Sequence, residues 1–303
     1  MEQGYKVVAF DRYNPNNHWG WLEESEYRND MEVILGDVRD YDSVFRALEG
    51  CNAVFHLAAL IGIPYSYVSP LAYIRTNVEG TYNVLESARS LEVDQVLITS
   101  TSETYGTAQY VPIDEEHPLV GQSPYSASKI GADQLALSYH KSFDLPIKVV
   151  RPFNTYGPRQ SSRSVIPTII CQNLKGSGEL QLGNLEPTRD LTYVKDTCTA
   201  FLEIFQAPEF YGEVTNIGMN IEVSIGDLVA EINQLMGVDL TIVKDQQRVR
   251  PYNSEVERLV CSNKKLRSYT SWQPQYSLQS GLQETIIWYR ERGPSTKAEI
   301  YHV

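Results

Sequence analysis

The sequence predicts an α/β protein, in which a doubly wound parallel sheet carries helices on both faces and a smaller lobe follows. Short runs rich in valine, isoleucine and leucine alternate with longer segments of helical period, as expected when buried parallel strands are joined by crossover helices. The chain has 303 residues, of which 42% are hydrophobic, so it can bury a large core. We expect the first domain at residues 1–154 and the second lobe at residues 155–303, with some segments returning to the first.

The elements follow from local pattern and from end signals. Runs rich in β-branched and other apolar residues predict strands at residues 5–10, 32–35, 53–57, 95–100, 147–151 and 214–217. Apolar positions at helical spacing predict helices at residues 43–48, 73–91, 125–142, 164–175, 224–236 and 278–292. Ser224 is suited to cap the start of the fifth helix.

An acid, Asp11, directly follows the first predicted strand. This pattern is typical of the second strand of a Rossmann unit, whose terminal acid bonds the ribose of a dinucleotide. The first strand of such a unit ends in a glycine-rich turn, but the first forty residues hold only Gly4, Gly20 and Gly36, at the wrong spacing. We therefore expect a Rossmann-like sheet that lacks its first βα unit, whether the unit was lost from this sequence or the protein works without it.

Composition excludes several classes of function. The net charge is −12 and the isoelectric point is about 4.9, which argues against a nucleic-acid surface. No stretch approaches the roughly eighteen apolar residues that a membrane helix needs, and the beginning does not look like a signal peptide. We expect a soluble cytoplasmic protein without a membrane partner. Four cysteines are far apart, which predicts buried free thiols and no metal site: Cys51, Cys171, Cys198 and Cys261.

The segment Tyr125-Ser-Ala-Ser-Lys129 places a tyrosine and a lysine one helical turn apart, on the same side of a helix. A lysine held beside a phenol favours the phenolate, so we expect the pKa of Tyr125 to lie below its usual value of about 10. Such a tyrosine can take a proton from an alcohol while hydride leaves the same carbon. The same spacing also occurs on ordinary solvated helices.

Hydroxyl groups and one acid follow the fourth predicted strand, in the run Ser100-Thr-Ser-Glu-Thr-Tyr-Gly106. Open α/β sheets bind ligands at the carboxyl ends of their strands, so Thr101, Ser102 and Glu103 are candidate catalytic residues. A capped turn that ends at Gly106 is the alternative interpretation.

Together with further segments, the two motifs resemble the extended short-chain dehydrogenases, the NAD-dependent epimerase and dehydratase family that acts on nucleotide sugars. The resemblance extends over essentially the whole chain, through the segments Gly36-Asp-Val-Arg-Asp40, His56-Leu-Ala-Ala59, Asn77-Val-Glu-Gly-Thr81 and Arg151-Pro-Phe-Asn-Thr-Tyr-Gly-Pro-Arg159.

The resemblance implies roles for individual residues. Thr101 would bond the C4 oxygen of the sugar, with Tyr125 as base and Lys129 as its helper. NAD would be held by Asp11, Asp37, Val38, Leu57, Ala58, Asn77, Tyr125 and Lys129. The nucleotide diphosphate end of the substrate would be held by Asn154, Arg189 and Arg250, and guanidinium groups suit phosphate oxygens. His56 is expected to be a packed histidine at a strand end.

Glu103 separates the reactions within this family, because simple 4-epimerases usually carry a small or neutral residue there. A carboxylate beside the sugar could remove the C5 proton after C4 is oxidised, and Glu103 or Ser102 could assist loss of the C6 hydroxyl. This chemistry predicts a 4,6-dehydratase. UDP-glucuronate decarboxylases carry the same Thr-Ser-Glu triplet, so a decarboxylase, an epimerase and a non-catalytic sugar-nucleotide-binding remnant stay as alternatives.

The resemblance is greatest to N-acetylglucosamine 4,6-dehydratases of legionaminic-acid pathways, on the segments Asn17-His-Trp-Gly-Trp21, 106–117 and 250–258. It implies a UDP- or GDP-linked N-acetylglucosamine as substrate and a role in surface-glycan synthesis. It also implies a homodimer in which the helices from Tyr73 and from Tyr125 form a four-helix bundle.

Overall fold

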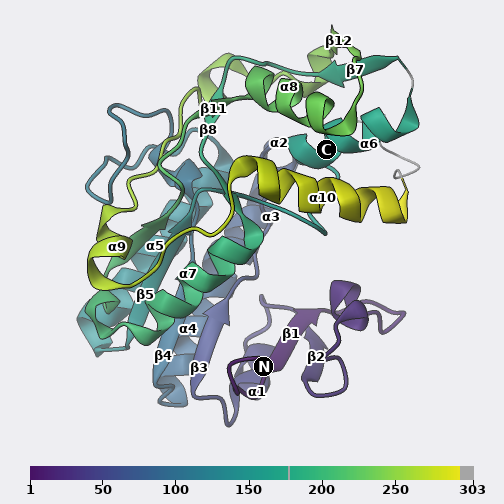
Figure 1. Ribbon diagram of the computed structural model, residues 1–303. Coiled ribbons are helices and arrows are strands. Elements are labelled where there is room, and N and C mark those ends of the chain that lie inside the picture. The colour runs from purple at the N-terminus through teal and green to yellow at the C-terminus, as the bar shows by residue number, and fades with distance from the viewer. Residues whose placement is uncertain (177, 294–303) are drawn as a thin grey trace.

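The computed structural model describes residues 1–176 and 178–293 (Figure 1); residues 294–303 of the predicted second lobe lie outside this range. Its largest sheet is four-stranded and parallel, in the order β10-β5-β4-β3. The strands are β3 (Ala53–His56), β4 (Gln95–Thr99), β5 (Ile147–Pro152) and β10 (Val214–Ile217). They coincide with four of the predicted strands, so the predicted α/β class with a parallel sheet is confirmed.

Successive residues of β4 bury their side chains on opposite faces of this sheet. Val96 and Ile98 pack in one core with side chains of α1 (Tyr41–Leu48), α4 (Gly80–Ser90) and α5 (Pro124–Phe143). Leu97 packs in a second core with α7 (Val194–Gln206) and α9 (Lys264–Tyr269). The sheet is therefore covered by helices on both faces, which explains why its strands are rich in apolar residues.

A separate parallel pair, β1 (Val8–Arg12) and β2 (Glu32–Gly36), lies beside this sheet (Figure 1). Within the described residues β1 bonds only β2, and β3 bonds only β4, so no strand joins the two sheets. The first strand was predicted at residues 5–10, but the register with β2 starts at Val8 and continues to Arg12. Asp11 therefore lies inside the strand, and the predicted boundary was wrong.

The helix predicted over residues 73–91 is divided into three pieces. Helix α3 (Pro70–Tyr73) leads into a π-helical turn, η2 (Ile74–Glu79), which continues as α4. The Asn77 side chain is buried and bonds both the N–H and the carbonyl of Leu60, at 2.8 and 3.0 Å. A π-turn at such a position is common near functional sites, and here it aims an amide at the loop after β3.

The second lobe has its own core beneath three helices, α6 (Val165–Lys175), α8 (Ile225–Met236) and α10 (Leu278–Arg292). The helices predicted in these regions are confirmed, and Ser224 caps α8 by accepting a bond from the Asp227 N–H. Three short strand pairs complete the lobe: β6 (Asn154–Tyr156) with β9 (Leu191–Tyr193), β8 (Thr188–Arg189) with β11 (Val223–Ser224), and β7 (Glu179–Leu182) with β12 (Thr241–Lys244). Helix α7 and strand β10 follow this lobe's first elements but return to the large sheet.

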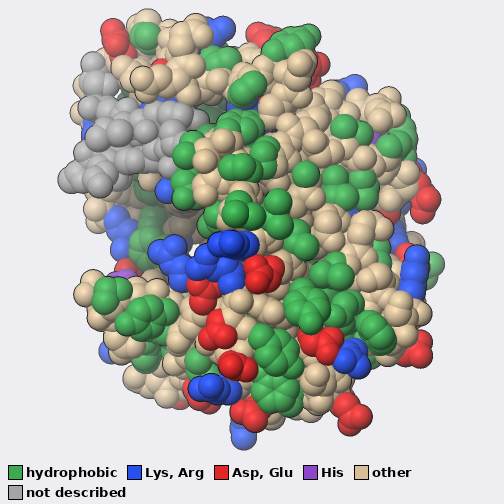
Figure 2. Space-filling model, turned by 180° about the vertical axis from the view of Figure 1, so that it is seen from behind, with side chains coloured by type: hydrophobic (Ala, Val, Ile, Leu, Met, Phe, Trp, Pro, Cys, Tyr) green, Lys and Arg blue, Asp and Glu red, His purple; other side chains and the backbone are tan. Residues whose placement is uncertain are grey.

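The remaining elements are short: α2 (Ile63–Val68) and the 3-10 turns η1 (Gly20–Glu24), η3 (Ser102–Tyr105), η4 (Pro208–Phe210), η5 (Gln246–Arg248) and η6 (Tyr252–Ser254). Within residues 1–176 and 178–293, no helix combines the length and apolarity that crossing a membrane requires. The face shown in Figure 2 carries hydrophobic side chains in several groups, with basic and acidic side chains between them.

All four cysteines are free, but the prediction that they are buried holds only in part. Cys171 and Cys261 are buried, Cys51 is half-buried and Cys198 is exposed. The prediction was wrong for Cys198, because this residue lies on a side of α7 away from the core that Ala200 and Ile204 enter. In the part of the chain that the structure describes, no group of histidine, cysteine and acidic side chains could hold a metal ion.

Candidate active site

The turn after β4 carries three of the predicted catalytic residues. Thr101 caps the 3-10 turn η3 by accepting a hydrogen bond from the Glu103 N–H at 3.3 Å. Ser102 and Glu103 are buried. This turn follows the carboxyl end of a central strand, where open α/β sheets place their ligands.

Helix α5 brings Tyr125 and Lys129 to the same place. Ser123 and Ser126 form a capping box at its start, and Pro124 occupies the first turn, so the sequence fixes where the helix begins. Both predicted residues are buried, and the Tyr125 phenol interacts with the Thr101 hydroxyl. The ring of Tyr73 stands edge-on to Tyr125, with centroids 6.1 Å apart. The structure therefore brings Thr101, Ser102, Glu103, Tyr125 and Lys129 together.

The pKa of Tyr125 moves in the opposite direction to the one expected. Burial raises the pKa of Tyr125 well above its usual value, and the charge of Glu103 adds to the effect, while the bond with Thr101 opposes it. Lys129 does not offset this shift, because its ammonium group donates to the carbonyl oxygen of Thr99 at 2.6 Å. Burial also lowers the pKa of Lys129. Helical spacing placed both groups on one side but could not show where the ammonium points.

A buried ion pair lies one turn further along α5. Arg151 of β5 donates to Asp133 at 2.7 Å, and the Ser100 hydroxyl donates to the same carboxylate oxygen at 2.5 Å. The charge of Asp133 raises the pKa of Lys129, against the larger effect of burial. Asp133 thus supports the charged form of the lysine, a role that the sequence analysis missed although Asp133 continues the spacing of Tyr125 and Lys129.

Five of the predicted cofactor residues lie at or just after the carboxyl ends of β1, β2 and β3: Asp11, Asp37, Val38, Leu57 and Ala58. The Asp11 carboxylate accepts a bond from the Arg12 N–H at 2.7 Å. Asp37 pairs with Arg39, and hydrogen bonds from this guanidinium lower the pKa of Asp37. Leu57 is 64% exposed and follows β3, and Ala58 beside it is also exposed. An exposed apolar surface at this position suits the flat, partly apolar body of a dinucleotide.

Two of the predicted cofactor residues have internal partners. The Val38 carbonyl accepts a bond from Asn83 at 2.9 Å. The Asn77 amide bonds Leu60 through both ends and also donates to the Ser128 hydroxyl at 2.9 Å. Asn77 therefore anchors the loop after β3 to α5. His56 is packed as expected: its ring contacts the Thr81 hydroxyl at 3.1 Å, and burial, with help from Lys129, lowers its pKa to about 3.

The facing edges of β1 and β3 are joined by side chains and not by backbone bonds. The Phe205 ring of α7 contacts Phe55 of β3 and Tyr5 before β1, with ring centroids 5.1 and 5.6 Å away. Between these strands the described residues supply no glycine-rich turn and no helix N-terminus, the features that bind a pyrophosphate in dinucleotide-binding folds.

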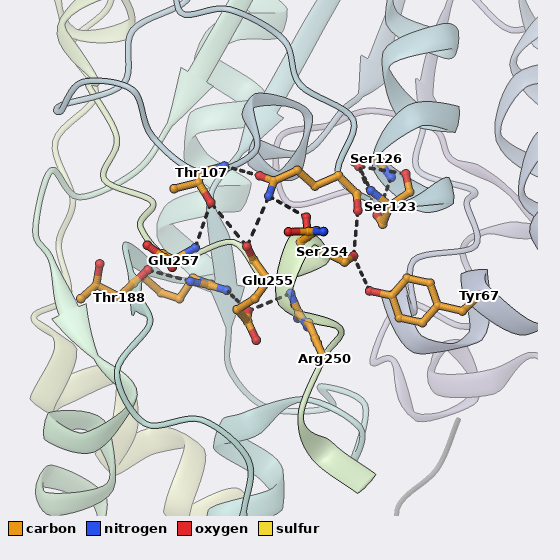
Figure 3. Close-up of polar contacts among 12 residues, drawn as sticks. Tyr67, Thr107, Ser123, Ser126, Thr188, Arg250, Ser254, Glu255 and Glu257 are labelled. Atoms are coloured by element: carbon orange, nitrogen blue, oxygen red, sulfur yellow. Dashed lines mark hydrogen bonds and ion pairs between the residues drawn. The ribbon is translucent and has the colours of Figure 1, made fainter. Parts of the chain in front are cut away.

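The predicted substrate arginines meet at the carboxylate of Glu255, which Figure 3 shows beside Arg250. Glu255 Oε1 lies 3.5 Å from Arg189 Nη2 and 3.5 Å from Arg250 Nη1. Arg189 is buried, and the charge of Glu103 also acts on it, which places it near the catalytic turn. Arg250 Nη1 and Asn154 Oδ1 are buried atoms without a hydrogen-bond partner, as expected of groups that bind a polar ligand. Glu255 was missed, although it lies inside the 250–258 segment singled out from the sequence.

The sequence is similar to known proteins over most of its length. The family model for GDP-mannose 4,6 dehydratase matches residues 1–285. The low-salt glycan biosynthesis protein Agl12 of Haloferax volcanii is 30% identical over 275 residues, which cover 90% of this chain and 86% of the relative. A dTDP-glucose 4,6-dehydratase of Streptomyces antibioticus is 31% identical, over 86% of this chain and 77% of the relative.

Solved structures of sugar-nucleotide enzymes have the same fold as this chain. The dTDP-glucose 4,6-dehydratase DesIV from Streptomyces venezuelae, crystallised with NAD and TYD bound, superposes with a TM-score of 0.85 at 29% identity and covers 94% of this chain and 88% of that one. A UDP-glucose 4-epimerase from Thermotoga maritima with UDP-glucose gives a TM-score of 0.87 at 26% identity, over 96% of this chain and 93% of that one. The chain belongs to the GDP-mannose 4,6 dehydratase family, within the short-chain dehydrogenase/reductase class of sugar-nucleotide dehydratases and epimerases.

Proposed function

We propose that this protein catalyses the NAD-dependent 4,6-dehydration of a nucleotide-activated hexose to a 4-keto-6-deoxy sugar. The observation that carries the proposal is the group formed by the half-buried Thr101 and the buried Ser102, Glu103 and Tyr125. A 4-epimerase needs a base at the C4 hydroxyl but no carboxylate beside C5 and C6, whereas a dehydratase needs both.

The residues present fit NAD at its two ends. Asp11 would hold the adenosine ribose, Asp37 and Val38 the adenine, and Leu57 and Ala58 the floor, while Tyr125 and Lys129 would hold the nicotinamide end. Between β1 and β3 the described residues form no glycine-rich turn and no helix whose N-terminus could hold the pyrophosphate. Comparing the NAD affinity of this chain with that of a fusion carrying a strand, a glycine-rich turn and a helix at its start tests whether such a unit is needed.

NAD, held by these residues, would supply the acceptor for hydride from C4 of the sugar and the donor of hydride to C6. Tyr125 takes the proton of the C4 hydroxyl, whose oxygen Thr101 holds. The resulting ketone acidifies the C5 hydrogen, and Glu103 removes it as a proton. Glu103 or Ser102 then assists departure of the C6 hydroxyl as water, and a proton returns to C5. The sum is loss of one water with no net oxidation.

Arg189, Arg250 and Asn154 would hold the nucleoside diphosphate. The two guanidinium groups carry two positive charges against the single charge of Glu255, so a net positive charge remains that favours binding of an anionic diphosphate. As the sugar we propose N-acetylglucosamine, linked to UDP or GDP, in surface-glycan synthesis. The support for this choice is the resemblance carried by residues 17–21, 106–117 and 250–258.

A decarboxylase is the second candidate, and one observation favours it. Arg189 is buried near Glu103, so a cation is available on the side of the site where a C6 carboxylate would lie. The relatives also include a putative UDP-glucose 4-epimerase from Methanocaldococcus jannaschii, 29% identical. The chemistry of the product separates the three reactions.

Product mass tests the proposal. The chain with NAD is incubated in turn with UDP-N-acetylglucosamine, GDP-N-acetylglucosamine, UDP-glucose, dTDP-glucose and UDP-glucuronate. We expect loss of one water from an N-acetylglucosamine nucleotide. Loss of carbon dioxide from UDP-glucuronate would show a decarboxylase, and an isomer of unchanged mass would show an epimerase. Conversion of dTDP-glucose or UDP-glucose alone would keep the reaction and overturn the proposed sugar.

We also propose a homodimer. Large hydrophobic side chains are exposed along the stretch from the loop after β3 through α2, α3 and η2 to α4, and Phe143 is exposed at the end of α5: Ile61, Tyr65, Tyr67, Val68, Leu71, Ile74, Tyr82 and Phe143. Such a surface is typical of a subunit interface. Analytical ultracentrifugation should show a dimer that Leu71→Glu weakens. The cytoplasmic location expected from the sequence stays a prediction.

A further inference from the structure

Gln122 connects three parts of the active site through one side chain and its own carbonyl; its partners Thr107, Ser254 and Glu255 are labelled in Figure 3. Its amide oxygen accepts a bond from the Thr107 N–H at 2.5 Å. Its amide nitrogen donates to the carbonyl oxygens of Asn253 and Glu255, at 3.2 and 3.3 Å. Its main-chain carbonyl accepts a bond from the Ser254 hydroxyl at 2.7 Å. Both ends of the amide are therefore in use.

The first connection reaches the catalytic turn. Thr107 follows Gly106, the residue that ends η3 after Ser102 and Glu103. Gly106 has a φ of +64°, and a Cβ there would lie 2.5 Å from Gln122 Oε1 and 2.9 Å from the Val120 carbonyl oxygen. The glycine is required both by its backbone conformation and by the approach of the Gln122 amide. The end of η3 is thus shaped to receive this side chain.

The second connection reaches the arginine loop, which we define as residues 250–257. Gln122 holds the main chain of Glu255, and the Glu255 carboxylate lies between Arg189 and Arg250. The Thr107 hydroxyl bonds the same loop at the Glu255 carbonyl and the Glu257 N–H, at 3.4 and 3.2 Å. A further bond of 2.6 Å joins Ser254 to Tyr67 of α2. These bonds hold the loop mainly through its backbone. The carboxylate of Glu255 therefore stays available to Arg189 and Arg250.

The third connection is covalent. Gln122 immediately precedes Ser123, which caps the helix that carries Tyr125 and Lys129. We infer that Gln122 is a positioning residue that fixes the arginine loop relative to η3 and α5. It couples occupation of the diphosphate subsite to the geometry of Glu103 and Tyr125. This inference rests on the proposed function, because it takes the arginines to hold the diphosphate.

The coupling follows from how these bonds are distributed along the chain. Gln122 lies 15 residues from Thr107 and 131 residues from Asn253, so its bonds join segments that the chain itself leaves far apart. A displacement of about 1 Å in a catalytic group can reduce a rate about 100-fold. A diphosphate that draws Arg250 inward also pulls on the arginine loop, which is attached to both η3 and α5. Binding energy from the nucleotide can therefore order Glu103 and Tyr125 around the sugar.

Gln122→Glu tests the inference, because it keeps the size and the acceptor but removes the two N–H donors and repels the carbonyls of the loop. Gln275→Glu is the matched control, since Gln275 is exposed and, among the described residues, its side-chain amide donates only to the nearby Gln273 carbonyl. Ser254→Ala removes the hydroxyl that bonds the Gln122 carbonyl and Tyr67, so it weakens the same attachment from the loop side. It provides a second test if Gln122→Glu fails to fold.

Three measurements are made on each variant: amide hydrogen exchange, the affinity for UDP and GDP by calorimetry, and turnover. We expect Gln122→Glu to speed exchange in both residues 102–107 and 250–257 and to weaken binding of the nucleoside diphosphate about 5- to 30-fold, the effect of one or two hydrogen bonds. Ser254→Ala should act in the same direction to a smaller extent, and Gln275→Glu should change nothing. Unchanged exchange in residues 250–257 would overturn the inference.

A double-mutant cycle tests the coupling itself. In the parent chain Arg250→Ala should lower kcat as well as raise KM, whereas in the Gln122→Glu background it should raise KM alone. If the two substitutions change kcat independently, so that the effect of the double variant is the product of the two single effects, the coupling is contradicted. If the parent chain converts no nucleotide sugar, the proposed function fails, and the exchange and binding measurements still decide whether Gln122 fastens the arginine loop.

Discussion

The ammonium group of Lys129 bonds the carbonyl oxygen of Thr99 at 2.6 Å, while the phenol of Tyr125, one helical turn earlier, interacts with Thr101. The two groups share one side of α5, yet the pKa of Tyr125 is raised by burial and not lowered. Positive charge brought close to the phenol would lower its pKa and favour its action as a base.

Tyr125→Phe should lower kcat by about 100- to 10,000-fold, the usual contribution of a general base. The phenyl ring keeps the packing against Tyr73 and removes only the hydroxyl. Tyr139→Phe serves as control, since Tyr139 lies on the same helix and bonds Glu86 at 3.0 Å, away from the catalytic turn. Product formation measured by mass spectrometry gives both rates. A Tyr125→Phe enzyme with parental kcat would exclude the phenol as the base.

Glu103→Gln should stop dehydration at the stage after C4 oxidation, because the amide cannot remove the C5 proton. We expect kcat to fall at least about 100-fold and exchange of the C5 hydrogen with heavy water to stop. Glu116→Gln is the control, since Glu116 is exposed. Continued C5 exchange in Glu103→Gln would assign the proton transfer to another group.

The predictable part of the fold depends on local pattern. The strands β3, β4, β5 and β10 were predictable because each is a short run rich in β-branched and other apolar residues, and α5 because its cap and period agree. The division of residues 73–91 was not predictable, because it depends on the bonds of Asn77 to Leu60, 17 residues earlier.

The predictable part of the site consists of motifs contiguous in sequence. Thr101, Ser102 and Glu103 follow a strand, and Tyr125 and Lys129 share a helix side, so each group is visible locally. Gln122 was missed because its amide bonds a loop more than a hundred residues further along the chain, and Glu255 was missed because its carboxylate pairs with Arg189 of a separate segment. The pKa of Tyr125 was predicted in the wrong direction because burial, which the spacing of two residues does not reveal, has the largest effect.

Arg250→Ala should weaken binding of UDP or GDP about 10- to 100-fold, as expected for loss of a charge-assisted bond to phosphate. The loss should shrink as salt is added, since the interaction is between charges. Arg258→Ala is the control from the same segment, because Arg258 pairs with Glu222 at 2.6 Å. Calorimetric titration measures both, and equal losses in the two variants would argue against a specific phosphate role for Arg250.

His56 should make the fold sensitive to acid. Burial lowers its pKa from 6.5 to about 3, so between these values the unfolded chain binds more protons than the folded one. The stabilisation is complete above pH 6.5 and is lost as the pH falls toward 3. His56→Gln should flatten the decline by up to about 1.4 kcal/mol per pH unit. Urea unfolding at a series of pH values measures this slope, and parallel curves for the two proteins would contradict the assignment.

Isotope transfer tests the central claim most directly. The chain with NAD is given the nucleotide sugar with deuterium at C4, and the product is examined by mass spectrometry and proton NMR. A 4,6-dehydratase predicts a 4-keto-6-deoxy product that has lost one water and carries the deuterium at C6. Deuterium retained at C4 in a product of unchanged mass would contradict dehydration and identify an epimerase.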